Sequence, residues 1–253
     1  MRRAGVRRLQ KTAARDATDA DCRNGVFADM RMLAVFEKSE RVRHIGHLDI
    51  QRSVQRGLRR SGLPVAYSQG FNPHILVTFA SALSTGACGK REIMDVTMAE
   101  DTSADEFLTR MNRAMPPEMQ LSEARAIDNK HPSLMGMVRA AVYDLTIRDG
   151  EQGEKLAAAI PEMMSKEQVT AMRKTKTRLT EVDIKPLILG ISGNENHIRT
   201  TLILNERESC KPQMLLDALK EQAGITEEVR MLVTRESLLG EDENGTLTPL
   251  ERL

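Results

Sequence analysis

The sequence predicts an α+β fold made of two ferredoxin-like units in tandem, each with an antiparallel sheet. Two observations lead to this prediction. In residues 30–128, short apolar or alternating segments typical of strands are interspersed with two amphipathic helical segments. Their order is β-α-β-β-α-β, which is the signature of a split βαβ unit. A second series in the same order can be traced over residues 137–238.

The first unit, residues 30–128, begins with an apolar strand at Met32–Phe36. A helix follows from about His47 to Ser61, with Gly46 as N-cap and Gly62 as stop. Two short strands, 65–67 and 75–79, enclose a turn, and residues 91–99 alternate as a half-buried strand does. Ser103 with Glu106 predicts a capped second helix, which Pro116 ends before a last strand at 119–127.

The second unit, residues 137–238, begins with a strand at 139–147. A helix over 154–165 is expected to break at Pro161. Strands are predicted over 166–184 and 197–204, on either side of a glycine-containing loop. A helix over 211–224 starts near Pro212 and stops at Gly224, and a strand over 228–238 closes the unit.

The two ends of the chain lie outside these units. Residues 1–29 hold six basic side chains among the first fifteen and no apolar period, which indicates either a disordered basic extension or a misplaced start ahead of Met30. Residues 239–253 are polar and acidic, and we predict a disordered tail.

Composition excludes several classes of protein. The net charge is +1, so nucleic-acid binding would have to come from local patches. The three cysteines, Cys22, Cys88 and Cys210, are widely spaced without a CxxC, which argues against a disulfide framework and predicts no metal site in this chain. No apolar run has membrane-helix length, and a cytoplasmic location is expected.

The predicted helix at 47–61 carries a row of arginines. Ile50, Val54 and Leu58 share one face, and the other side holds Arg52, Arg56, Arg59 and Arg60, with Arg43 just before the helix. Guanidinium groups stay charged and bind phosphates bidentately. The row is either a phosphate-binding surface or a solvated helix face.

A polar turn follows this helix. Its stretch "YSQGFNPH" contains Tyr67, Ser68, Gln69, Gly70, Phe71, Asn72 and His74. Gly70 and Asn72-Pro73 suit a tight hairpin, while the aromatic and polar side chains are also suited to contacting bases. We expect the arginine row and this turn to open onto one shared concavity.

Further candidates lie elsewhere in the chain. Lys174, Lys176 and Arg178 would share one face of a strand, either as protection of an exposed edge or as an extension of a nucleic-acid groove. His44, His47 and His74 are candidates for acid–base catalysis, with Asp49 close to the first two in sequence. Packing or capping is the simpler role for each histidine.

The stretch "HIGHLDIQRSVQRGLRRSGLPVAYSQGFNPHILVTFASALSTG", followed by "REIMDV", resembles the bacterial radical-SAM-linked domain of uncharacterised function in its stand-alone form. The resemblance implies a radical SAM protein as partner. It also implies that the iron–sulfur cluster and S-adenosylmethionine belong to that partner, because this chain lacks CxxxCxxC and holds no cofactor of its own. Gly46 replaces the serine usual in the motif.

Three functions are compatible with these features. The first is a non-catalytic accessory protein that binds structured RNA, such as tRNA or rRNA, for a radical SAM enzyme. The second is a metal-independent endoribonuclease that uses one of the three histidines. The third is a protein–protein scaffold that binds no nucleic acid.

Overall fold

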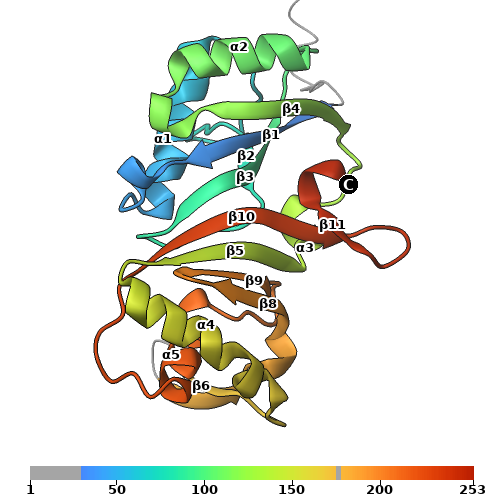
Figure 1. The fold of residues 1–253 in the computed structure, drawn as a ribbon. Coiled ribbons are helices and arrows are strands. Elements are labelled where there is room, and N and C mark those ends of the chain that lie inside the picture. Colours follow the sequence, from blue (N-terminus) through green and yellow to red (C-terminus); the bar gives the residue numbers. More distant parts are fainter. Residues whose placement is uncertain (1–29, 175–177) are drawn as a thin grey trace, which may run out of the picture.

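The computed structural model describes residues 30–174 and 178–253, so the predictions for residues 1–29 and for Lys176 lie outside the described residues. Within this range the chain forms an α+β structure around one nine-stranded sheet, with a separate two-stranded sheet. The long sheet runs β4-β1-β3-β10-β5-β9-β8, while β2 pairs with β3 and β11 pairs with β10. Figure 1 shows this sheet running through the whole molecule.

The first half of the chain has the predicted order of elements. They are β1 (Met30–Lys38), α1 (His47–Ser61), β2 (Val77–Phe79), β3 (Cys88–Thr97), α2 (Ala104–Ala114) and β4 (Leu121–Asp128). All pairs here are antiparallel, and β1 lies between β3 and β4. The helix over 47–61 lies where the residue pattern predicts it, and the strand predicted over 91–99 is found at 88–97. The short strand predicted at 65–67 is reduced to isolated bridges of Val65 and Tyr67.

The second half repeats the series with an insertion. Its elements are α3 (Leu134–Met137), β5 (Ala140–Ile147), α4 (Gly150–Ser165), β6 (Thr170–Lys174), β7 (Leu179–Asp183), β8 (Ile188–Asn194), β9 (His197–Ile203), α5 (Pro212–Gln222) and β10 (Met231–Glu241). Strand β5 lies antiparallel between β10 and β9, and β9 pairs with β8. The β6–β7 hairpin forms its own small sheet.

Two predictions fail in this half. Helix α4 continues through Pro161 instead of breaking there. Gly190 and Gly193, predicted in a loop, lie in β8. Gly193 is close to α4, where a Cβ atom would come within 2.8 Å of the Ala157 Cβ, so the strand needs glycine at this position.

The two halves meet at a short parallel contact. Thr234 and Arg235 of β10 pair with Cys88 and Gly89 at the start of β3. The rest of the same edge of β3 is taken by β2, which pairs with residues 94–96. Helices α1 and α2 accompany the first half and α4 and α5 the second (Figure 1). The chain thus forms one sheet out of two helix-covered halves.

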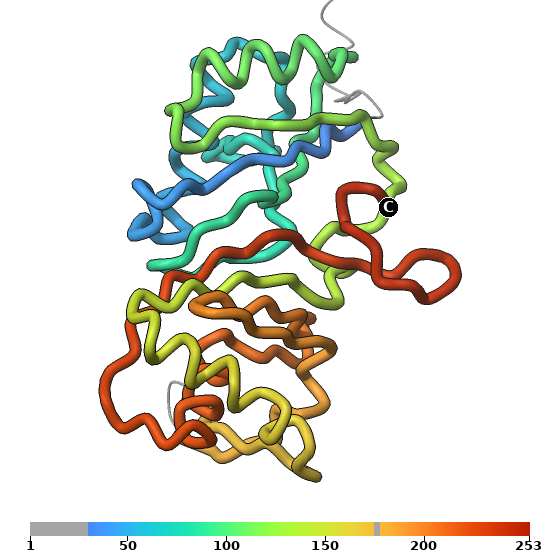
Figure 2. Tube along the Cα trace, viewed as in Figure 1, coloured from blue at the N-terminus to red at the C-terminus, as the bar shows by residue number. Residues whose placement is uncertain are grey.

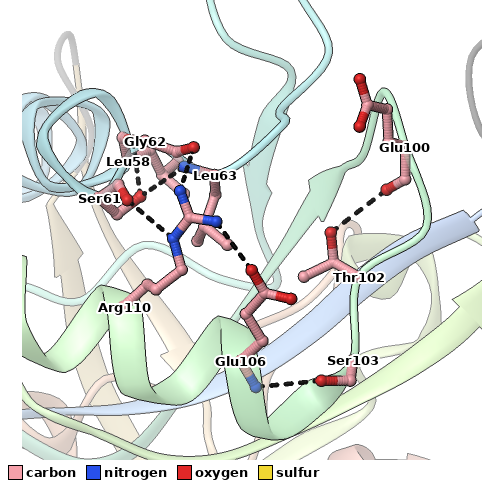
Figure 3. Close-up of polar contacts among 9 residues, drawn as sticks. All are labelled: Leu58, Ser61, Gly62, Leu63, Glu100, Thr102, Ser103, Glu106 and Arg110. Carbon is pink, nitrogen blue, oxygen red and sulfur yellow. Dashed lines mark hydrogen bonds and ion pairs between the residues drawn. The ribbon is translucent and has the colours of Figure 1, made fainter.

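Arg110 of α2 holds the end of α1. Helix α1 ends at Gly62, which adopts the left-handed conformation with φ 64°. Arg110 donates from Nε to the Ser61 carbonyl oxygen at 3.0 Å, from Nη2 to the Gly62 carbonyl oxygen, and from Nη1 to Glu106 Oε1 at 2.8 Å (Figure 3). Ser103 caps α2 as predicted, because its Oγ accepts from the Glu106 backbone N–H. These bonds fix α1 against α2.

The C-terminal prediction was wrong. Residues 239–253 do not form a disordered tail: they complete β10 and then form β11 (Leu247–Pro249) and the 3-10 turn η4 (Leu250–Arg252). Figure 2 shows this red segment turning back beside the first half. Leu250 is fully buried, and Glu251 accepts a hydrogen bond from Arg91 Nε at 2.7 Å. The segment is polar in composition, but its few apolar side chains have a core to enter.

Candidate nucleic-acid interface

The arginine row lies on the solvent side of α1, as the helical period predicts. Ile50, Val54 and Leu58 are buried against the sheet and α2. The four arginines of the row, Arg52, Arg56, Arg59 and Arg60, are all exposed. At 1.5 Å rise per residue they extend over about 12 Å of helix.

The contacts of the row differ between its members. Arg52 forms an ion pair with Asp49 at 2.9 Å, and Arg60 donates to the Ala114 carbonyl oxygen at 2.6 Å. Within residues 30–174 and 178–253, Arg56 and Arg59 have no carboxylate partner. Arg43 pairs with Glu40 at 3.0 Å and is half-buried. Two guanidinium groups of the row therefore remain available to an external anion.

The polar turn projects into solvent between Tyr67 and Ile75. These two residues form an isolated bridge, and the Ser68 N–H donates to the His74 carbonyl oxygen at 2.8 Å. Ser68 Oγ also lies 2.7 Å from His74 Nδ1, so the serine and histidine close the turn together. Phe71 is 107% exposed, and Gly70 has φ 132°. The Phe71 ring is thus exposed to solvent, and the hairpin does not need an aromatic residue at this position.

Cavities of about 570, 600 and 400 Å³ are lined by other segments, and neither the arginine row nor the turn contributes to them. Both belong to the first half: directly after α1 ends, Val65 of the segment leading into the turn forms a bridge with Met98, the residue that follows β3. Arg59 and Arg60, at the last turn of α1, are thus the members of the row closest in sequence to it. The expected shared concavity stays a prediction.

The three candidate histidines have different surroundings. His44 and His74 are exposed, whereas His47 is half-buried with its ring edge-on to Phe79 at 5.4 Å between centroids. Burial lowers the pKa of His47 from its usual value. A packing role at the start of α1 accounts for this histidine. In the part of the chain that the structure describes, no group of three or more His, Cys, Asp or Glu side chains is placed to hold a metal ion.

The second basic run is only partly described. Lys174 ends β6 and Arg178 immediately precedes β7, and both are exposed. Lys174 lines a cavity together with Arg173, Arg207 and Lys211, the last two from another segment of the second half. This gathering of cations was not visible in the sequence, because the four residues lie on two separate segments.

A buried charged cluster was also missed. Arg235 of β10 is 1% exposed and donates to both carboxylate oxygens of Glu92 on β3, at 2.8 and 2.5 Å. It also donates to Ser81 Oγ and to the carbonyl oxygens of Ser81 and Ala82. Burial by itself would lower the pKa of Arg235, but the charge and hydrogen bonds of Glu92 raise it above the usual value.

Lys38, at the end of β1, belongs to the same region. It is fully buried and donates from Nζ to the Arg43 carbonyl oxygen at 2.8 Å, and burial lowers its pKa. The alternating pattern of the strands could have revealed that Lys38 and Glu92 are buried. Lys38 is in phase with buried Met32 and Phe36, and Glu92 is in phase with buried Met94. A charge at a core-facing strand position predicts a buried partner.

The cavity nearest this cluster lies where the two halves meet. It has a volume of about 570 Å³. Its walls come from the 82–87 loop before β3, Tyr143 of β5, the start of β10, and the segments on either side of α5, at 209–213 and 228–230. Arg235 forms part of its floor, but that guanidinium is already bonded to Glu92 and the Ser81 loop.

Comparison with known proteins gives one match to a family. A family described as an uncharacterized protein conserved in bacteria, DUF2344, matches residues 31–212. No curated protein matches the chain. Among solved structures, a heavy metal efflux pump in its crystal form II shares 9% identity at a TM-score of 0.23, over 83% of this chain and 28% of the pump chain. The chain spans less than a third of the pump chain's length, and a likeness at that score carries no argument. Among the described residues, no helix is long and apolar enough to cross a membrane.

Proposed function

The chain belongs to the DUF2344 family of proteins conserved in bacteria, and we propose that this member binds RNA through the exposed arginine face of α1. The observation that carries the proposal is the state of Arg56 and Arg59. Both are exposed, both lack a carboxylate partner among the described residues, and both lie in a row with Arg52 and Arg60. Arginine groups presented along a rigid helix suit successive phosphates of a nucleic-acid backbone.

The turn at 67–75 supplies the second contact in this proposal. Phe71 is a fully exposed aromatic ring on a hairpin closed by the Ser68–His74 hydrogen bond, and Tyr67 is 39% exposed beside it. Aromatic rings stack on unpaired bases, which is the usual way that proteins contact single-stranded RNA. In this arrangement α1 holds the backbone and the turn contacts a base, with Gln69 and Asn72 available for base edges.

We also propose that RNA binding serves a partner enzyme of the radical SAM class. The support is the sequence resemblance of residues 44–96 to radical-SAM-linked domains, together with the exposed motif residues, which have no evident role in the core of this chain. The cluster and S-adenosylmethionine would be held by that partner. We propose in addition that each half of the chain is a ferredoxin-like unit. The support is the strand order: β4-β1-β3-β2 in the first half and β10-β5-β9-β8 in the second half are equivalent.

The test is a salt series of RNA binding. We expect Arg56→Gln with Arg59→Gln to weaken binding of a labelled structured RNA. The slope of log affinity against log salt should become shallower by about 1.4 to 1.8, because two fewer phosphates are neutralised. Arg199→Gln with Arg252→Gln is the matched control, since it removes two exposed arginines elsewhere.

Equal effects of the two double variants, or no RNA affinity in the wild-type chain, would contradict the proposal. Phe71→Ala should weaken binding to unpaired RNA more than binding to a duplex.

The mixtures of protein and labelled RNA, incubated with EDTA and resolved by size, test the alternative of a metal-independent ribonuclease. Co-purification with a radical SAM protein that survives nuclease treatment tests the scaffold.

A further inference from the structure

Cations without a carboxylate partner among the described residues line the cavity between the two halves and the cavity next to it. We define the basic rim as the five residues Arg173, Lys174, Arg207, Lys211 and Arg230. They line the junction cavity of about 570 Å³ or the adjoining cavity of about 400 Å³, and the two cavities share Ser209, Lys211 and Gln213 as walls. The rim therefore borders two neighbouring cavities with a common wall, far along the chain from the arginine row of α1.

The rim has an excess of positive charge at a concave surface. Within the described ranges, none of its five cations forms an ion pair with a carboxylate. The same walls hold two carboxylates, Asp217 and Glu228, and Asp217 Oδ1 already accepts a hydrogen bond from Gln213 Nε2 at 2.8 Å. Like charges gathered in a cleft raise the local concentration of anions.

Two rim residues are held in place by the fold. Arg173 is half-buried and donates from Nη2 to the Ser209 carbonyl oxygen at 3.0 Å, which ties β6 to the segment entering α5. The N–H of Arg148 donates to the Arg230 carbonyl oxygen at 2.9 Å, which anchors the start of β10. These backbone contacts leave the remaining guanidinium donors of both arginines for a ligand.

One part of the junction cavity's wall is apolar, beside polar residues such as Ser84, Thr85 and Gln213. Its walls include the side chains of Leu83, Val229, Met231 and Val233, and the backbone at Gly86 leaves open space where a Cβ atom would lie. The volume lies within the range of about 300–1,000 Å³ that is usual for small-molecule sites, and such sites favour the junctions between units. An apolar wall beside a cationic rim suits a ligand with an uncharged body and an anionic group.

We propose that this junction cavity binds a phosphorylated ligand of nucleotide size, with the phosphate at Lys211 and the other rim cations and the body against Leu83, Met231 and Val233. The site is separate from the α1 surface and extends beyond the proposed RNA binding. Its ligand is either a free nucleotide or the phosphorylated end of an RNA chain, because both have a phosphate group attached to a nucleoside.

Calorimetric titration of the full chain tests the site. AMP should bind more tightly than inorganic phosphate, because only AMP contacts the apolar wall. Arg207→Gln with Lys211→Gln should weaken AMP binding by roughly tenfold for each cation that is removed from the phosphate. Ala82→Phe should narrow the cavity without removing charge, because Ala82 lines the cavity and contacts Arg235 through its backbone carbonyl oxygen.

The controls separate this site from the α1 surface. Arg56→Gln with Arg59→Gln should leave AMP binding unchanged, and an RNA with a 5′-hydroxyl should bind the rim variant as it binds the wild type. Competition by a 5′-phosphorylated oligonucleotide assigns the ligand to an RNA end, and its absence assigns a free nucleotide. The proposal is overturned if AMP and phosphate give no saturable heat, or if Arg199→Gln with Arg252→Gln weakens AMP binding as much as the rim variant.

Discussion

Arg235 forms a buried ion pair that links the two halves of the sheet. Its side chain crosses from β10 to Glu92 on β3 next to the parallel contact, and Ser81 and Ala82 take the remaining donors. Gly89 makes room for this, because a Cβ atom there would lie 2.5 Å from the Glu92 side chain. A buried charge of this kind is tolerated because its partners are complete, and loss of one partner is more costly than loss of both.

Glu92→Gln is therefore expected to destabilise the protein by about 3–5 kcal/mol, because it leaves a guanidinium buried without a counter-charge. Replacing both residues by methionine should recover much of that loss. Arg52→Gln is the control: it breaks an ion pair whose side chains are 65% and 60% exposed, and should cost at most about 1 kcal/mol. Urea unfolding followed by circular dichroism gives the three values. Equal losses for Glu92→Gln and Arg52→Gln would contradict this account of the buried pair.

At the scale of elements, glycines set how closely helix α4 lies to the β8–β9 hairpin. Gly153 of α4 faces the hairpin turn, where a Cβ atom would come within 2.7 Å of the Asn196 Cα. In the same turn Glu195 has φ 49°, the one positive value among the described residues other than glycine. Backbone occupies the space beside Gly153, so no side-chain movement can relieve a contact there.

Gly153→Ala should thus destabilise the protein by about 1–3 kcal/mol, although alanine has the higher helix propensity. Gly150→Ala in the same helix has open space around the added Cβ and is the matched control. It should be neutral or stabilising by up to about 1 kcal/mol. Thermal unfolding of both variants measures the difference, and a stabilising Gly153→Ala would show that the hairpin yields easily.

At the scale of the whole molecule, one core crosses the boundary between the halves. Leu33 and Val35 of β1 point away from α1 and α2 and pack in the same core as Leu145 of β5, Leu238 of β10 and Leu250 of η4. β1 is therefore buried on both faces. The C-terminal segment covers the back of the first half, and because both halves share this core we expect the described chain to unfold as one cooperative unit.

Leu250→Ala should lower the free energy of unfolding by about 2–5 kcal/mol, because it leaves a cavity against β1. Thr248→Ala, on half-buried β11, is the control and should change it by about 0.5 kcal/mol or less. The expected result in urea is a single transition for both variants, shifted to lower denaturant only for Leu250→Ala. If the C-terminal segment were disordered, Leu250→Ala and Thr248→Ala would have the same free energy of unfolding, and that result would contradict this prediction.

The sequence by itself determined the local structure of the first half. The 3.6-residue period placed Ile50, Val54 and Leu58 inside and the arginine row outside, and the Ser103–Glu106 spacing located the start of α2. The same local patterns located β1, β3 and β4. These signals suffice because amphipathic period, caps and turn residues act within a few neighbouring positions.

Only the tertiary structure decided the features that depend on distant partners. It decided that β3 and β10 join two halves into one sheet, that Arg235 finds Glu92, and that the acidic C-terminal segment docks through Leu250. It also decided that Arg173 and Lys211, from separate segments, gather at one cavity. Contacts between residues far apart in the chain arise from packing of whole elements, which no local pattern encodes.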